Sequence, residues 1–299
     1  MKVAFSDFYG GYEQDLSCNP VTSYFVNSPK FTIVQPWQDP DLIVCSTWGN
    51  KHTKYNDVPK IMWTAENLVA GQPWPGYTFW DGVDWTISNN HRESIIDLPS
   101  NIRHYYVPYA GIHHDMDKIK TLHDKNYNKP KTKFCCFVSR AQGAAEGYKL
   151  RYDFFNLIND DYRHVDSAGP TQNNVGYTAP RGDAYFDWVS DYKFMICFEN
   201  SQGAGYITEK IFTPYAGATI PIYWGDKSNF DLVRKEACLL YTTPQETLAK
   251  LIMLDRNPEM YENLRKESLF YPEVEGKDDI LNQKYLRKVY DQIIAEIKS

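Results

Sequence analysis

The sequence lacks several features that mark membrane and secreted proteins. No apolar run approaches the roughly 20 residues needed to cross a bilayer. An acid at Asp7 interrupts the N-terminal segment before a signal-peptide core can form. None of the asparagines lies in an N-glycosylation sequon. Together these absences favour a cytoplasmic protein.

Cysteine spacing and charge exclude further classes. The six cysteines include no C-x-x-C pair, which argues against a zinc knuckle or a dithiol redox site. Cys45, Cys135, Cys136 and Cys197 stand in apolar, strand-like runs, where a free thiol behaves as a small hydrophobic side chain. With 32 basic and 38 acidic residues, a net charge of −6 and no long basic run, the chain is not expected to bind nucleic acid or to adhere generally to membrane surfaces.

The length and the aromatic content indicate a large fold with two possible uses for its rings. The 299 residues correspond to about two domains of roughly 150 residues each. Aromatic residues make up 15% of the chain, with 23 Tyr, 15 Phe and 8 Trp. They fit either a core rich in rings or the recognition of a flat ligand such as a sugar or a nucleobase, and composition alone does not separate the two.

Short apolar runs alternate with connecting segments along the chain, which predicts an α/β architecture. The expected strands are residues 2–5, 31–34, 42–45, 60–63, 85–88, 105–107, 134–139, 194–198, 219–223 and 238–241. The expected helices are residues 150–159, 185–189, 208–216, 244–254 and 283–298.

The polar and basic segment 112–133 predicts a linker, with or without a short helix. We therefore expect an N-terminal α/β domain over residues 1–129 and a second α/β domain over residues 130–275. Residues 276–299 are expected to form a C-terminal helix that packs back on the first domain.

The densest set of chemical groups lies in residues 194–225, FMICFENSQGAGYITEKIFTPYAGATIPIYWG. The pattern predicts a strand, a loop with two glycines, a helix that begins near Thr208, and a second strand. A helix N-terminus directs N–H groups and the positive end of its dipole at such a loop, which suits an anion. Lys210 in the first turn opposes that dipole, and either an anionic ligand or a solvent-exposed pair with Glu209 accounts for it.

The same run closely resembles the donor-binding signature of the α1,3-fucosyltransferases of glycosyltransferase family 10, with its CFENS-like strand end, GY(V/I)TEK helix start and IPIYWG strand. Two weaker stretches agree in order and spacing: FVS at 137–139 followed by LRYDFF at 150–155, and WTAEN at 63–67. The resemblance implies a bacterial-type member with the GT-B fold, in which two Rossmann-like α/β domains face each other across a cleft. A bacterial-type enzyme would act in the cytoplasm or at the periphery of the inner membrane.

The resemblance implies GDP-β-L-fucose as donor and transfer with inversion to give an α-L-fucoside. The implied acceptor is O3 of N-acetylglucosamine in N-acetyllactosamine-type glycans, which gives a Lewis x type product. Transfer to type 1 chains (Lewis a), another nucleotide sugar, and a sugar-binding protein without catalysis are the alternatives. The family is not built around a metal, so no metal is expected, although added Mn²⁺ or Mg²⁺ can stimulate some members.

Such a reaction needs a base for the acceptor hydroxyl and positive charge beside the departing GDP. By the resemblance Glu66 is the base; its sequence context alone also fits an acid in a first helical turn after Thr64. Arg151 and Lys210 are the implied neutralisers of the diphosphate, and Glu209 is assigned to the ribose. Without the resemblance, Arg151 also fits a solvent-exposed charge on a helix.

Weaker assignments complete the predicted site. Further donor contacts are expected from Asn200, Tyr206, Glu199 and Ser139, of which Glu199 fits a structural role equally well. Acceptor contacts are expected from Trp63, Asn67 and Trp74. After Ser139 the chain has Arg140 where the family pattern has Asn. The DxD triplets at 39–41 and 115–117 follow no clear strand in the donor half, so they are not expected to bind a metal.

Overall fold

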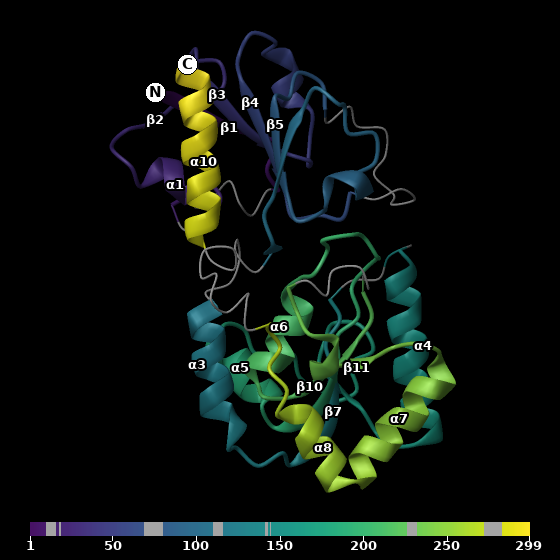
Figure 1. Cartoon of the computed structure of the whole chain (residues 1–299). Coiled ribbons are helices and arrows are strands. Elements are labelled where there is room, and N and C mark those ends of the chain that lie inside the picture. The colour runs from purple at the N-terminus through teal and green to yellow at the C-terminus, as the bar shows by residue number, and fades with distance from the viewer. Residues whose placement is uncertain are drawn as a thin grey trace. The chain divides into compact units, whose positions relative to one another are not determined.

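The computed structural model describes residues 1–9, 16–17, 19–68, 80–109, 116–140, 143, 145–225, 232–271 and 283–299. The chain divides into two compact units. Unit 1 comprises Met1–His113 together with Asp279–Ser299, and therefore holds both ends of the chain (Figure 1). Unit 2 comprises His114–Asp278.

Unit 1 is built on a parallel six-stranded sheet with the order β2-β1-β3-β4-β5-β6. Its strands are β1 (Lys2–Ser6), β2 (Thr32–Ile33), β3 (Leu42–Ser46), β4 (Lys60–Thr64), β5 (Trp85–Ser88) and β6 (Arg103–Tyr106). The helices are α1 (Ser23–Val26) and α10 (Gln283–Lys298), with 3₁₀ turns at Lys51–Lys54 and Arg92–Ser94. Strands β3 and β4 are buried along their whole length, as expected for inner strands of a parallel sheet.

Helix α10 covers one face of this sheet (Figure 1). Its apolar stripe, with Val289 and Ile293, is buried in the same core as Ile61 of β4. At its last turns the indole N–H of Trp85 donates a hydrogen bond of 2.9 Å to the carboxylate of Glu296. The C-terminal segment is therefore an integral part of unit 1.

Unit 2 is built on a parallel five-stranded sheet with the order β11-β10-β9-β7-β8. Its strands are β7 (Lys133–Phe137), β8 (Asp166–Ser167), β9 (Tyr192–Ile196), β10 (Ile220–Tyr223) and β11 (Leu239–Leu240). Its helices are α3 (Met116–Tyr127), α4 (Glu146–Asp161), α5 (Asp183–Val189), α6 (Glu209–Ala216), α7 (Pro244–Arg256) and α8 (Pro258–Arg265), and a 3₁₀ turn lies at Lys235–Ala237.

Alternation along the strands places the helices of unit 2 on both faces of its sheet. Cys135 and Phe137 of β7 pack into the core shared with α4 and α7, whereas Cys136 between them packs towards Val189 of α5. Figure 1 shows α3, α5 and α6 on one side of this sheet and α4 and α7 on the other. The result is a three-layer arrangement, which agrees with the predicted α/β fold class.

The basic segment 112–133, which we predicted to be a linker with or without a short helix, holds helix α3, and from His114 onward it belongs to unit 2. The boundary between the units falls at His113–His114, before this helix, whereas the sequence placed it at 129–130. Within α3, Ile119 is buried, and the side chain of Asn126 donates to the carbonyl oxygen of Ala216 at 3.0 Å. The polar residues of α3 thus satisfy carbonyl groups at the end of α6, a role that no local pattern reveals.

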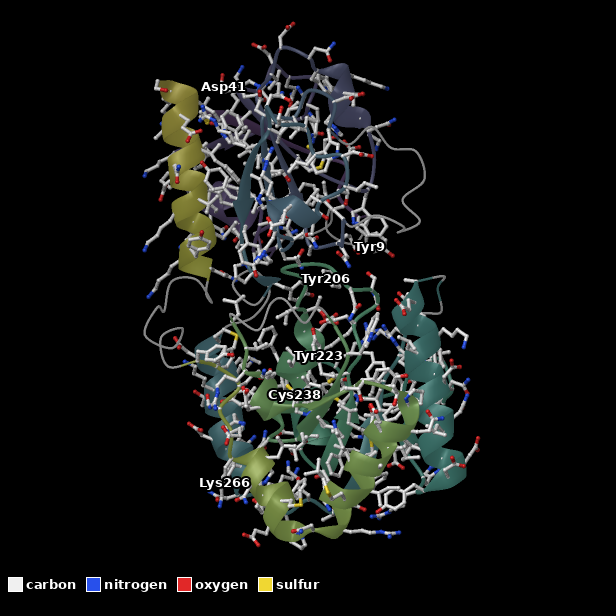
Figure 2. All side chains as sticks on the ribbon, turned by 45° about the vertical axis from the view of Figure 1, so that its right-hand side comes forward. Tyr9, Asp41, Tyr206, Tyr223, Cys238 and Lys266 are labelled. Carbon is white, nitrogen blue, oxygen red and sulfur yellow. The ribbon has the colours of Figure 1, made fainter. Side chains whose placement is uncertain are left out.

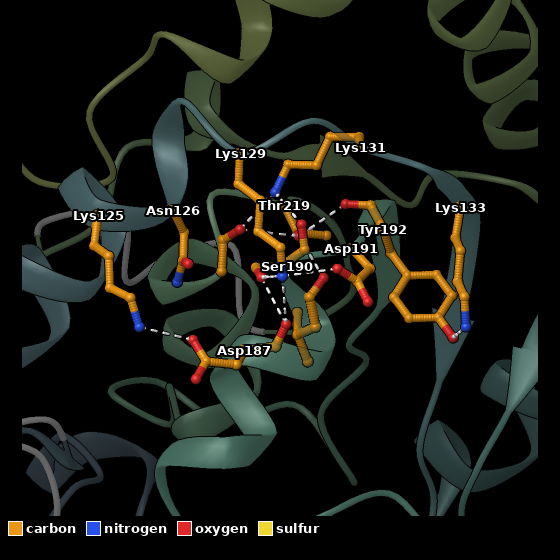
Figure 3. A network of polar contacts seen from close by, with 12 residues as sticks. Lys125, Asn126, Lys129, Lys131, Lys133, Asp187, Ser190, Asp191, Tyr192 and Thr219 are labelled. Atoms are coloured by element: carbon orange, nitrogen blue, oxygen red, sulfur yellow. Dashed lines mark hydrogen bonds and ion pairs between the residues drawn. The ribbon is translucent and has the colours of Figure 1, made fainter.

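Lysines that follow α3 extend this network (Figure 3). The ammonium group of Lys129 lies 2.7 Å from a carboxylate oxygen of Asp191. That of Lys131 donates to the carbonyl oxygens of Ser190 at 2.8 Å and Gly217 at 2.6 Å, just beyond α5 and α6. Cations at helix C-termini complement the negative end of the helix dipole. This basic cluster therefore has a structural role in unit 2.

Lys131→Met is expected to remove a pH dependence of stability between about pH 7 and 10. Burial, with Arg265 and Lys129 nearby, lowers the pKa of Lys131 to about 7, against ~10.4 in an unfolded chain. Between these two pKa values Lys131 is protonated in the unfolded chain but largely neutral in the folded one. A rise in pH therefore favours the folded wild type. Urea unfolding at several pH values measures the difference between variant and wild type. That difference should change across the window for Lys131→Met, and a difference that stays constant contradicts the assignment.

The described cysteines are all buried free thiols: Cys45, Cys135, Cys136, Cys197 and Cys238. Burial raises the pKa of each thiol. This confirms that the four in apolar runs serve as small hydrophobic side chains. Within the described ranges, none of the helices has both the length and the apolar character that a membrane crossing requires.

Candidate functional site

A cavity of about 450 Å³ opens in unit 2 beside residues that follow β7 and β9. Both are parallel strands, and ligands of such sheets bind at the carboxyl ends of the strands. Four cationic side chains line the cavity: Arg140, Arg151, Arg181 and Lys210. The one carboxylate among the described lining residues is Glu209. The excess of positive charge in a partly enclosed space suits an anionic ligand.

Buried Glu199 holds the start of α6. One of its carboxylate oxygens accepts the backbone N–H of Thr208 at 2.8 Å, and the other accepts the Thr208 hydroxyl at 2.7 Å. The ammonium group of Lys210 lies 3.3 Å from the second oxygen. Burial raises the pKa of Glu199, and the charge of Lys210 acts against this rise. Glu199 thus positions the helix start and Lys210, and it is not among the residues that line the cavity.

Lys210 and Glu209 bring opposite charges to the cavity from the first turn of α6. The Lys210 ammonium group lies 3.1 Å from a carboxylate oxygen of Glu209. Although burial alone would raise it, the pKa of Glu209 falls to about 2 because of the Lys210 charge and the hydrogen bonds from Lys210 and Thr208. Glu209 is therefore an ionised acceptor at neutral pH. The Thr208 side chain makes no cap bond to the N–H groups at the start of α6. Such N–H groups and the positive end of the helix dipole suit an anion.

Arg151 is a buried guanidinium held in a fixed orientation. Its Nε donates to the carbonyl oxygen of Gly147 at 3.0 Å, and its Nη2 donates to Oδ1 of Asn200 at 2.7 Å. The guanidinium carbon lies 4.7 Å from the ring centre of Tyr148, a cation–π distance. Burial lowers the pKa of Arg151, but an arginine stays protonated at neutral pH. Nη1 makes no hydrogen bond to the described residues, which leaves two N–H donors for a ligand.

A close backbone approach connects α4 to the loop after β9. The backbone N–H of Gly147 donates to the carbonyl oxygen of Asn200 at 3.0 Å. A Cβ atom at Gly147 would lie 2.0 Å from the carbonyl oxygen of Glu199 and 2.7 Å from that of Asn200. Only glycine fits there without moving the backbone that carries Glu199 and Asn200, and Asn200 is the side-chain partner of Arg151.

Gly147→Ala is therefore expected to destabilise unit 2 by about 1–3 kcal/mol, because the added methyl group displaces backbone rather than a flexible side chain. Arg151 should also lose its fixed partners, the carbonyl oxygen of Gly147 and the side chain of Asn200. Urea unfolding measures the loss of stability. Lys149→Ala is the matched control on the same helix; its ion pair with Asp153 is exposed and worth about 0.5 kcal/mol or less. Equal stability of the two variants would contradict the close approach.

The remaining predicted donor residues lie in two groups. Ser139 and Asn200 line the cavity, and the Ser139 hydroxyl accepts a hydrogen bond of 2.9 Å from Tyr152. Tyr206 is buried, its backbone N–H donates to the carbonyl oxygen of Gly203 at 2.9 Å, and it is not a lining residue. Figure 2 shows Tyr206 at the end of unit 2 opposite Lys266, beyond Tyr223. Tyr206 thus lies near the carboxyl edge of the sheet and outside the cavity lining.

Sequence reasoning missed part of the cavity. Arg181 and Tyr185 come from the segment between β8 and the end of α5, and Tyr148 from the first turn of α4. Arg140 was noted only as a departure from a family pattern. Neither Arg140 nor Arg181 forms an ion pair with any described residue. A basic residue next to a predicted strand end was the one local signal available, and it points to Arg140 alone.

The predicted base, Glu66, belongs to unit 1. It follows β4 at the carboxyl edge of the sheet, and its backbone N–H donates to the Thr64 hydroxyl at 3.0 Å. The next residues are tied to the loop after β5. The side chain of Asn90 donates to Asn67 at 2.8 Å and accepts the backbone N–H of Leu68 at 3.1 Å. These buried bonds fix the backbone on which Glu66 stands.

The predicted acceptor residues of unit 1 have different environments. Asn67 is buried and its amide is bonded to Asn90. Trp63 is 5% exposed and stacks on Phe8, with ring centres 6.3 Å apart and an interplanar angle of 11°. Trp74 lies outside the described residues. Trp63 and Asn67 therefore support the loop that carries Glu66.

The acidic triplets form no metal cluster in the described part of the chain. There, no three His, Cys, Asp or Glu side chains gather as metal ligands would. Asp117 is on helix α3, and Asp115 lies outside the described residues. Asp41 precedes β3 and accepts the backbone N–H of Lys2 at 2.7 Å. Asp117, which belongs to unit 2, is not among the residues that line its cavity.

Comparison with known proteins gives consistent matches. Residues 127–266 match the family model for the C-terminal part of glycosyltransferase family 10 (fucosyltransferase). A putative fucosyltransferase, R654, of Acanthamoeba polyphaga mimivirus is 31% identical over 220 residues, which cover 68% of this chain and 33% of that protein. The α-(1,3)-fucosyltransferase FucT of Helicobacter pylori is 26% identical over 262 residues, which cover 76% of this chain and 51% of that protein. The chain thus spans about a third to a half of the length of these relatives.

A solved structure shares the fold. The crystal structure of an α1,3-fucosyltransferase with GDP-fucose superposes with a TM-score of 0.68 at 20% identity, covering 98% of this chain and 90% of that one. At this identity the match establishes fold alone. It confirms the predicted GT-B fold class, with a Rossmann-like parallel sheet in each of the two units.

Proposed function

The chain belongs to glycosyltransferase family 10, the fucosyltransferases, and from this premise we propose that it transfers L-fucose from GDP-β-L-fucose to O3 of N-acetylglucosamine in N-acetyllactosamine-type glycans. The reaction inverts the anomeric carbon and gives a Lewis x type product. One observation carries the proposal: the cavity of unit 2, lined by four cations and an ionised Glu209 beside the start of α6. The names of the H. pylori relative and of the solved structure support GDP-fucose and the α1,3 linkage.

The diphosphate of the donor occupies the cationic part of this cavity. The free N–H donors of Arg151 and the ammonium group of Lys210 neutralise the phosphate oxygens, and the α6 dipole adds a fixed partial positive charge. These charges stabilise GDP as it leaves, which is where negative charge develops in the transition state. Glu209 accepts hydrogen bonds from the ribose hydroxyls.

Bond making and proton transfer take place at the acceptor hydroxyl. Glu66 accepts the proton of O3 as that oxygen attacks the anomeric carbon of fucose. The bond from this carbon to the β-phosphate oxygen breaks, GDP leaves with the electron pair, and attack from the opposite face converts the β-linkage to α. The reaction also requires binding contacts that hold both reactants in line. Two fixed cations supply the charge, so no metal is required, although added Mn²⁺ or Mg²⁺ can stimulate turnover.

The experiment measures GDP release and product structure. Purified protein is incubated with GDP-fucose and N-acetyllactosamine, with and without EDTA, and the product linkage is determined by NMR. We expect an α1,3-linked fucose on N-acetylglucosamine and turnover that persists in EDTA. Transfer to a type 1 disaccharide in preference to N-acetyllactosamine would favour the Lewis a alternative. Sugar binding without any GDP binding would favour a non-catalytic sugar-binding protein.

We also propose that the enzyme acts in a reducing compartment, the cytoplasm, peripheral to the inner membrane where its glycan acceptor is assembled. The support is that the five described cysteines are buried as free thiols, which is the usual state in reducing compartments. Alkylation of the protein as isolated from cells, followed by mass spectrometry, should find all six cysteines as thiols. A disulfide in that material would contradict this location.

A further inference from the structure

Unit 1 exposes three large aromatic side chains in the segments that follow strands β1, β2 and β3. Tyr9 is 56% exposed, Trp37 72% and Trp48 45%, whereas the other described aromatic residues of this unit are buried or half-buried. Isolated exposed rings are ordinary on protein surfaces, but a contiguous group signals a binding surface. Tyr9 and Trp48 are in contact, with ring centres 5.0 Å apart and planes tilted by 59°. Trp37 joins this pair if all three follow neighbouring strands at the same edge of the sheet.

Strand order puts them on one edge of the sheet. Trp37 follows β2, Tyr9 follows β1, Trp48 follows β3 and Glu66 follows β4, and each lies within four residues of its strand's end. Because the order is β2-β1-β3-β4 and all pairs are parallel, these four positions succeed one another along the carboxyl edge. Figure 2 shows Tyr9 at the end of unit 1 opposite Asp41, which precedes β3.

The pairing register sharpens this placement. Ser6 of β1 pairs with Cys45 of β3 near the ends of the two strands, and the contact between the rings of Tyr9 and Trp48 joins the segments that follow them. Strands lie about 4.8 Å apart, so the row from Trp37 to Glu66 spans three spacings, about 14 Å. We call Trp37, Tyr9 and Trp48 the aromatic row.

A second cavity, of about 370 Å³, lies at the far end of the row. Trp37 lines it together with the polar side chains of Gln35, Lys51 and Tyr55. In the described part of the chain none of these three polar groups makes a side-chain hydrogen bond. Asp7 in the wall is already engaged and accepts the backbone N–H of Lys51 at 2.9 Å. The cavity thus combines a fixed wall, a ring and available hydrogen-bonding groups.

We propose that the aromatic row and this cavity bind an extended oligosaccharide acceptor, whose reacting sugar lies at Glu66 and whose distal sugars stack on Trp48 and Tyr9 and end against Trp37. Rings present flat apolar faces to the C–H faces of sugars, while Gln35, Lys51 and Tyr55 supply donors and acceptors for hydroxyls. The inference rests on the proposed function and adds to it that acceptors of several sugars are preferred over a disaccharide.

The test compares two acceptors: the N-acetyllactosamine disaccharide and the hexasaccharide of three such units. In the wild type the hexasaccharide should have the lower KM. Trp48→Ala should raise KM for both by about ten-fold, because its ring lies next to the reacting sugar. Trp37→Ala should raise KM for the hexasaccharide by a similar factor and leave that for the disaccharide unchanged. The Kd for GDP, bound in unit 2, should not change.

Met253→Ala, which removes an exposed apolar side chain from α7 of unit 2, is the matched control and should change neither KM. Saturation-transfer NMR with the hexasaccharide and no donor gives a readout independent of catalysis. If the wild type binds the hexasaccharide but transfers no fucose, and the Trp variants lose this binding, the aromatic row is upheld and the proposed function is overturned. Transfer with KM values unaffected by either Trp variant, or no hexasaccharide binding, would overturn the aromatic row.

Discussion

Glu66→Gln is expected to lower kcat for fucosyl transfer by roughly 10²–10⁴, the usual contribution of a general base. The amide keeps the shape of the side chain but cannot accept the proton of the attacking hydroxyl. The backbone around Glu66 is fixed by Thr64 and by the Asn67–Asn90 pair, so the substitution leaves the loop in place. The affinity for GDP should stay at the wild-type value, because the cationic cavity in which we propose that GDP binds belongs to unit 2.

Initial rates with saturating GDP-fucose and acceptor measure this effect, and calorimetry measures the affinity for GDP. Glu93→Gln is the matched control, since Glu93 is in the same unit with a side chain 76% exposed and should be replaceable without effect. Glu66→Asp should retain part of the activity, because a carboxylate remains but is withdrawn from the substrate. A Glu66→Gln enzyme whose kcat is within ten-fold of wild type would show that another group takes the proton.

Lys210→Met should lower kcat/KM for GDP-fucose by roughly 10²–10³, the size found when one donor to a developing negative charge is removed. The variant loses the ammonium group beside Glu209 and Glu199. Two carboxylates then remain near the diphosphate without their shared cation, so repulsion adds to the lost attraction. The pKa of Glu209, which Lys210 holds at about 2, should rise.

Lys210→Arg separates charge from structure in this prediction. It restores a cation at the start of α6, so it should recover a large part of the activity if charge is what matters. Urea unfolding of both variants shows whether losing the Lys210–Glu199 contact also destabilises unit 2. If Lys210→Met keeps wild-type kcat/KM, or if Lys210→Arg is as impaired as Lys210→Met, Lys210 does not act by neutralising the leaving group.

Local sequence patterns were sufficient for the position of the elements that carry the cationic cavity. The helix at Glu209–Ala216 and the strand at Ile220–Tyr223 match the prediction. The expected caps did not form, because the Thr208 side chain makes no cap bond and Gly217 has a φ of −76° rather than a positive value. Helix α8 carried an equally local signal that we did not use: Asn257 precedes Pro258, and its side chain accepts the backbone N–H of Met260 at 3.1 Å.

Long-range contacts account for what the sequence did not reveal. The segment 112–133 reads as a linker because its polar side chains have no local partner, yet Asn126 bonds to Ala216 and Lys131 to Gly217. Arg181 lines the cavity, and the segment before it returns to the end of β8, where the backbone N–H of Ala179 donates to the carbonyl oxygen of Ala168 at 2.9 Å. Glu199 fitted either a ligand contact or a structural role, and only its bonds to Thr208 favour the second.

The central claim is that the cationic cavity of unit 2 holds the diphosphate of GDP-fucose. Calorimetric titration of GDP into the wild-type protein, with UDP as a second nucleotide and Lys210→Met as a second protein, tests it most directly. The account predicts one GDP bound per chain, tighter than UDP, with an affinity at least about ten-fold weaker in Lys210→Met, or about 1.4 kcal/mol. A wild-type protein that binds no GDP, or that binds it equally well without Lys210, would contradict the account.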